Sequence, residues 1–209
     1  MADWVTISSL ATAGGTLVLA VATFASVRSA NRSARVAETS LLASTRPLLM
    51  PSRLEDPAVK VGFADDHWVY VKGGCGTIEV VGDVVYLTMS LRNPGSGIAV
   101  LHGWRLEAGQ PGPGDHPPLD EFRRLTRDLY IPTGDVGFWQ GAIREADDDG
   151  RALVTKRIAD HDRVMVDLLY GDHYGGQRLI SRFSLQERED GSFLLTVGRH
   201  WNVDLPDPR

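Results

Sequence analysis

A run of 24 residues without a charged side chain, from Trp4 to Val27, constrains this chain more than any other feature. At about 1.5 Å per residue, a helix of this length reaches roughly 36 Å, enough for the ~30 Å hydrocarbon core of a bilayer. The most apolar part is its second half, from Leu17 to Val27. The sequence therefore predicts a transmembrane helix over residues 4–27.

Two other interpretations of this run remain open. It could be a buried helix of a soluble domain, although Gly14-Gly15 in its middle would be costly there and is better tolerated in membrane helices. It could also be a cleavable signal peptide with Ala20-Val21-Ala22 as its cleavage site. A signal peptide begins with basic residues, whereas this chain begins with Asp3 and the free amine. A retained membrane anchor fits the sequence best.

Three arginines that follow the apolar run, Arg28, Arg32 and Arg35, predict the orientation of the helix. Because Lys and Arg next to a membrane span stay on the cytoplasmic side, we expect an inner-membrane protein with its N-terminus outside and its C-terminal domain in the cytoplasm. The lipid bilayer is then the first partner. The same arginines could bind anionic lipid headgroups, at about 1 kcal/mol each near the surface. Simple snorkelling without lipid selectivity is the alternative.

The helical pattern continues past the bilayer, with alanines and Leu41 on one stripe and the arginines on another. Arg46-Pro47 ends it, because a residue before proline is disfavoured in the α region. The chain thus divides into a transmembrane helix at 4–27, a juxtamembrane helical extension at 28–46 and a soluble domain at 47–209. The last segment has the length of one domain.

Composition excludes several classes of function. The net charge of the chain is −5, and residues 54–209 contain 25 acidic and 17 basic residues, which disfavours nucleic acid as a partner. The single cysteine, Cys75, cannot form an intrachain disulfide or a thiolate zinc site. The glycine-rich motifs that hold nucleotide phosphates are absent from the sequence. We therefore expect no nucleic acid, no metal and no cofactor.

Short runs rich in β-branched and aromatic residues recur through the soluble domain, and most are bounded by Gly, Asp, Asn or Pro. They are His67–Lys72, Thr77–Val81, Val84–Leu91, Ile98–Leu106, Val164–Tyr170, Leu179–Leu185 and Phe193–Val197. This spacing predicts a mainly-β domain, an antiparallel sandwich or barrel. Residues 151–160 and 119–125 are the two candidates for short helices.

Two junctions predict turns. Asn93-Pro-Gly-Ser-Gly lies between two strand runs, and its glycines are expected to supply positive φ angles. Tyr170-Gly-Asp-His-Tyr-Gly-Gly-Gln joins two further runs as the turn of a hairpin.

These junctions, together with the N-terminal helix and Arg46-Pro47, resemble a group of bacterial single-pass membrane proteins with an immunoglobulin-like β domain. The segments Asp128–Ala142 and Arg199–Asn202 are similar to hypothetical proteins of high-GC bacteria. The resemblance spans most of the chain. It implies an immunoglobulin-like antiparallel β-sandwich over 47–209, and it implies no activity.

Possible catalytic residues are confined to histidines that lie beside carboxylates. Among the six histidines, His67, His161 and His173 adjoin aspartates, and His200 lies near the C-terminus. None has the spacing of a metal site on one element, and the sequence contains no Gly-x-Ser-x-Gly elbow. We assign no catalytic residue. A hydrolase using these turn residues remains the alternative function, and it requires the histidines to converge on one pocket.

The best candidate for a partner-binding surface is an arginine-rich segment followed by aromatic residues. Its residues are Arg123, Arg124, Arg127, Phe138 and Trp139, the composition of a protein interface. Ion-paired arginines of an edge strand would give the same pattern. In a helix the three arginines would cluster, whereas in a strand Arg124 would point away from the other two. The sequence thus predicts a membrane-anchored cytoplasmic module for protein interaction or sensing, with a protein partner whose identity is open.

Overall fold

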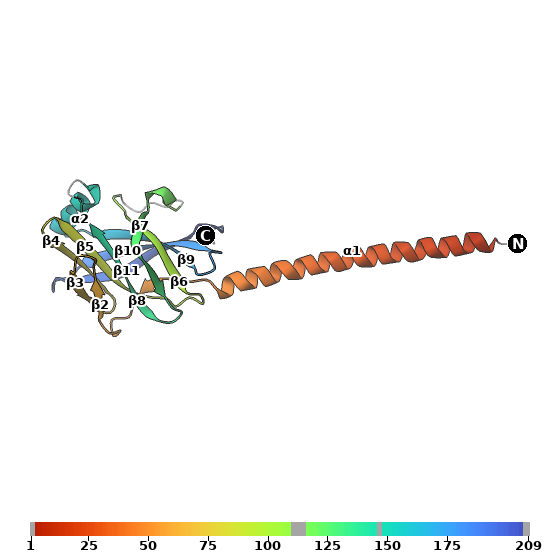
Figure 1. Cartoon of the computed structure of the whole chain (residues 1–209), viewed down its shortest axis with the longest axis horizontal. Helices are drawn as coiled ribbons and strands as arrows, with labels where there is room; N and C mark the ends of the chain where they lie inside the picture. The colour runs from red at the N-terminus through yellow and green to blue at the C-terminus, as the bar shows by residue number, and fades with distance from the viewer. Residues whose placement is uncertain (1–2, 110–115, 146–147, 207–209) are drawn as a thin grey trace. The chain divides into compact units, whose positions relative to one another are not determined.

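The computed structural model describes residues 3–109, 116–145 and 148–206 (Figure 1). The chain forms two compact units, Met1–Ala43 and Ser44–Arg209. We describe each unit by itself.

The first unit is made by one helix, α1 (Trp4–Ser44). In the described part of the chain it is the one helix long and apolar enough to cross a membrane, which is compatible with a single-pass anchor. The hydroxyls of Thr12, Thr16 and Thr23 each donate to the carbonyl four residues earlier, at 2.8–2.9 Å. These bonds satisfy the hydroxyls within the helix, as a bilayer requires. Arg28, Arg32 and Arg35 are exposed on its surface, and their binding to headgroups stays a prediction.

The second unit is mostly antiparallel β-sheet. Its strands are β1 (Met50–Pro51), β2 (Val59–Gly62), β3 (Trp68–Val71), β4 (Cys75–Val81), β5 (Val84–Arg92), β6 (Ala99–Leu106), β7 (Arg123–Ile131), β8 (Val136–Ile143), β9 (Val164–Asp172), β10 (Arg178–Glu187) and β11 (Phe193–Asn202). Nine of these form one sheet in the order β1-β5-β4-β11-β10-β9-β6-β7, with β8 on β5, while β2 and β3 form a separate hairpin. The predicted β9–β10 hairpin is present, and Gly175 has the positive φ of its turn.

The nine strands form a single curled sheet in place of two separate ones. Among the described residues, strand pairing joins its two halves at just two register positions, where Phe193 and Leu194 of β11 lie opposite Gly76 and Cys75 of β4. The mainly-β antiparallel class is therefore as predicted. The immunoglobulin-like sandwich implied by the resemblance is not confirmed.

The sheet encloses one apolar core. Alternate residues of β5, from Val85 to Leu91, point into it together with side chains of β6 and β8–β11. The opposite face of β5 is also buried, because the β2–β3 hairpin packs Val61 and Phe63 against Tyr86. Two covered faces explain why β5 reads as an almost continuous apolar run.

Because the sheet is curled, the strands at its two edges lie close together. The indoles of Trp104 on β6 and Trp139 on β8 meet edge to face, with ring centroids 5.3 Å apart. A Cβ on Gly141 would lie 2.8–3.0 Å from these two rings, and a Cβ on Gly137 would lie 2.8 Å from Ile131 of β7. Glycine at these two positions of β8 therefore lets side chains from β6 and β7 pack directly on its backbone.

Two short helices accompany the sheet. The helix α2 (Asp149–Ala159) covers most of the predicted segment 151–160, and the side chain of Asp148 caps it by accepting from the N–H of Gly150 at 2.7 Å. At 119–125 the chain forms only the 3-10 turn η1 (Leu119–Glu121) before β7 begins. The arginine segment is therefore a strand.

The residues that follow α1 form a strap, Thr45–Leu49, that is held by the loop after β5. The carbonyl of Arg46 accepts from the N–H groups of Ser96 and Gly97, and Asn93 Oδ1 accepts from the N–H of Leu48 at 3.1 Å. A Cβ on Gly97 would lie 1.8 Å from the carbonyl oxygen of Thr45. This glycine is needed for close approach of two backbones, which corrects the expectation that it supplies a positive φ.

Candidate partner-binding site

The strand β7 is unpaired with its neighbour β6 in the middle of its length. Leu129 pairs with Leu101 of β6, and Arg124 pairs with Gly103, so residues 125–128 lie opposite the single residue His102. A bulge of this kind bends a strand and interrupts its ladder. It separates the first two residues of β7, Arg123 and Arg124, from the regularly paired residues 129–131.

The edges of β7 and β8 face each other along a seam. The two strands follow one another in the chain, yet β7 is in register only with β6, and β8 only with β5, among the described residues. A side-chain contact bridges the seam instead. Arg127 Nη2 donates to Gln140 Oε1 at 2.8 Å, and the guanidinium lies 5.3 Å from the ring centroid of Phe138.

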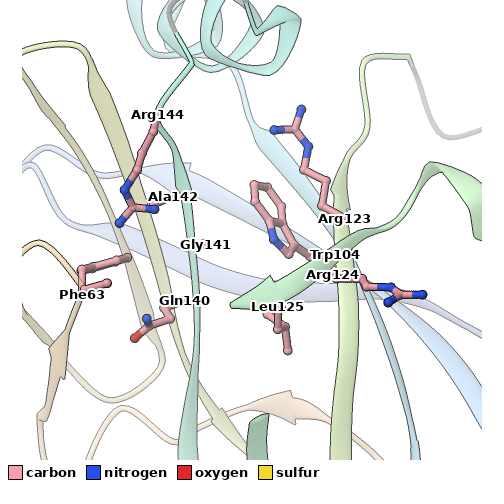
Figure 2. Close-up of a pocket in the computed structure, with 10 residues that line it drawn as sticks. Phe63, Trp104, Arg123, Arg124, Leu125, Gln140, Gly141, Ala142 and Arg144 are labelled. Atoms are coloured by element: carbon pink, nitrogen blue, oxygen red, sulfur yellow. The ribbon is translucent and has the colours of Figure 1, made fainter. Parts of the chain in front are cut away.

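A cavity of about 180 Å³ opens in this seam (Figure 2). Its lining comes from four places in the fold: β7, β8, Trp104 of β6 and the segment before β3. Figure 2 shows the Trp104 indole between β8 and β7, with Leu125 pointing into the opening. The lining residues are Phe63, Ala64, Trp104, Arg123, Arg124, Leu125, Gln140, Gly141, Ala142 and Arg144.

Two of the three arginines that line the cavity already have carboxylate partners. Arg123 forms a two-pronged ion pair with Asp148, with one N–O distance of 2.7 Å, and this pair holds the pKa of Asp148 below its usual range. Arg144 donates to Asp65 at 3.2 Å. The pKa of Asp65 is also lowered, chiefly because the Tyr86 hydroxyl donates to the same carboxylate at 2.6 Å.

The guanidinium of the third arginine, Arg124, has no hydrogen bond or ion pair to any residue that the structure describes. Its side chain is exposed, and Figure 2 shows it pointing away from β8, while Arg123 points toward α2. The alternation matches the strand geometry expected for neighbouring residues. An unpaired, solvated guanidinium is free to bind a carboxylate of another molecule.

The structure brings together four of the five residues predicted as a partner surface. Arg123, Arg124, Arg127 and Phe138 border the seam. The fifth, Trp139, is fully buried, so it supports the site from within the core and is not part of the surface.

Most residues that line the cavity were not among the five predicted for this surface. Gln140 comes from β8, Arg144 directly follows β8, and Trp104 comes from β6. Gly137 and Gly141, placed two residues to either side of Trp139, are the one sequence signal that could have indicated close packing on this strand.

Three of the four candidate histidines, His67, His161 and His200, have separate partners, so the hydrolase alternative gains no support. His67 bonds to Glu79, and His161 bonds to Glu187. His200 Nδ1 lies 2.6 Å from Ser181 Oγ, but Ser181 is fully buried and also bonds to the Tyr170 hydroxyl, which is a core network that a substrate cannot reach. Within the described ranges, groups of three His, Cys, Asp or Glu residues suited to a metal ion do not occur.

Comparisons with protein-family models, curated proteins and solved structures found no match to this chain. The site is therefore interpreted from its own geometry.

Proposed function

We propose that this protein is an interaction module, anchored in the inner membrane by α1, whose cytoplasmic β domain binds a protein partner through the β7–β8 seam. The observation that carries the proposal is the exposed Arg124, whose guanidinium is unpaired among the described residues, beside a cavity lined by Trp104 and Leu125. Interfaces are enriched in arginine and aromatic residues, and pockets next to such residues hold their anchoring side chains.

Charge supports an acidic partner. Two of the three arginines at the cavity are paired with Asp148 and Asp65, so Arg124 supplies the positive charge of the rim although residues 54–209 carry a net charge of −8. A local positive rim on an acidic domain attracts a carboxylate-bearing surface at this place and repels it elsewhere. The lipid-binding arginines of α1 are a separate part of the proposal, and the anchor itself needs only the apolar run.

Site-specific photo-crosslinking in cells tests the proposed surface. A diazirine analogue of leucine in place of Leu125 keeps the side-chain shape, and we expect it to form a discrete adduct with one partner. The matched control is the same analogue at Leu54, which is 66% exposed and does not line the cavity. Equal labelling from both positions, or none from Leu125, would overturn the proposal.

The cytoplasmic placement has its own test. A reporter that is active only in the periplasm, fused after Arg209, is expected to stay inactive, because the arginines after the span retain this side in the cytoplasm. The control is a reporter that is active only in the cytoplasm at the same position. High activity of the periplasmic reporter would reverse the predicted orientation.

A further inference from the structure

The seam is sealed on its inner side and unpaired along its edges. Ile131 packs on Gly137, and the two indoles pack on Gly141, so side chains close the core behind the gap. In front of them, neither strand has a ladder partner on its seam side among the described residues. The domain can therefore keep this gap without exposing its core.

The free edge of β8 is the more regular of the two. All eight of its residues are in register with β5, without a shift, from Val136 opposite Arg92 to Ile143 opposite Val85. In an antiparallel ladder, alternate residues direct their N–H and C=O groups to opposite sides. Half of the main-chain groups of β8 therefore face the seam. An unpaired edge of this length is a template for another strand.

Because of its bulge, β7 does not itself pair with the free edge of β8. Residues 125–128 have no register with β6 and none with β8, and the cavity lies beside them. Arg127 reaches Gln140 through its side chain only, so the contact across the seam does not use the main chain of either strand.

We infer that the partner contributes an extended acidic segment, which adds as a strand to the seam edge of β8. This inference rests on the proposed function and specifies its ligand. Main-chain hydrogen bonds to β8 supply the affinity. One carboxylate of the segment meets the exposed guanidinium of Arg124, and a second, at an alternate position, replaces Asp65 as the partner of Arg144. The net negative charge of the rest of the domain disfavours acidic segments at other edges.

A synthetic peptide tests this mode directly. The probe is a fluorescein-labelled octapeptide with Glu at alternate positions and Thr between them, titrated with the full-length chain in detergent and followed by fluorescence anisotropy. We expect saturable binding, lost when alternate backbone nitrogens are methylated in one of the two possible registers. Methylation keeps the charge and removes N–H donors, so equal binding of all three peptides would overturn strand addition.

Protein variants locate the binding edge. Arg124→Glu combined with Arg144→Glu is expected to weaken binding at least tenfold, with the melting temperature measured in parallel. Lys156→Glu combined with Arg163→Glu changes the net charge equally on exposed positions away from the cavity and is expected to alter affinity less than twofold. Equal weakening by both pairs, or no binding of the probe at all, would overturn the inference.

The two proposals fail differently. An adduct from Leu125 in cells, without binding of the acidic octapeptide, leaves the interaction module standing and removes the strand mode. Hydrogen exchange shows at which strand the peptide binds. Bound peptide is expected to slow exchange of amides in β8 and not in β4, and slowing in β4 alone would place the peptide at another edge.

Discussion

Replacing Asp167 with Ala is expected to lower the free energy of unfolding of the β domain by about 3–5 kcal/mol. The carboxylate is fully buried and accepts from Arg105 Nε at 3.0 Å and from Arg182 Nε and Nη2 at 2.7 Å each. Its removal leaves two mostly buried guanidinium groups with incomplete partners. Glu107, which also pairs with both arginines, does not replace it because it is already engaged.

Chemical unfolding of the full-length protein, followed by tryptophan fluorescence in detergent, measures this loss. The matched control is Asp204→Ala, which breaks the pair between Asp204 and Arg178 near the surface, at 2.6 Å. Exposed ion pairs contribute about 0–1 kcal/mol, so we expect a much smaller effect. Similar losses in both variants would show that the buried position of Asp167 is not what makes its network important.

Replacing Asn93 with Ala is expected to release the strap and to destabilise the domain by at least about 3 kcal/mol, because each buried polar group left without a partner costs ~1–3 kcal/mol. The buried Asn93 amide donates to the carbonyls of Gly97 and Ile131 at 2.7 and 3.0 Å. Its oxygen accepts from the N–H groups of Leu48 and Gly95 at 3.1 and 3.0 Å.

Hydrogen exchange at the Leu48 and Leu49 amides, combined with unfolding measurements, follows the strap in this variant. We expect fast exchange at Leu48. Asn202→Ala provides the control, because it removes the bond from Arg46 at 2.7 Å and keeps the Asn93 contacts. Protected strap amides in Asn93→Ala, with stability close to that of the native chain, would contradict this role of the asparagine.

The strands with clear apolar patterns were predictable, whereas β7 and β8, the two strands of the seam, were not among the predicted runs. Val84–Leu91 and Val164–Tyr170 are buried runs, and both form strands as expected. In β8, by contrast, Gly137 and Gly141 interrupt the apolar pattern, because indole and isoleucine side chains from other strands occupy the space of a side chain there. In β7 the bulge at 125–128 breaks the period-two alternation on which strand prediction depends.

The candidate site was predictable only as far as it is local in sequence. Arg123, Arg124 and Arg127 lie within five residues, so their composition was visible in the chain. The cavity depends on Trp104 and Arg144, which the curl of the sheet brings to the same place. Contacts between opposite ends of a sheet leave no periodic trace in the sequence.

The strap also determines how the β domain bears a mechanical load. Its bonds reach the loop after β5 through Asn93, β9 through the Tyr170 hydroxyl and β11 through Asn202, so they touch both halves of the sheet. Tension that enters the chain at Ser44 is therefore distributed over several bonds in parallel and does not unzip one edge strand. We expect a chain attached in this way to resist pulling better than the two-residue pairing of β4 with β11 would alone.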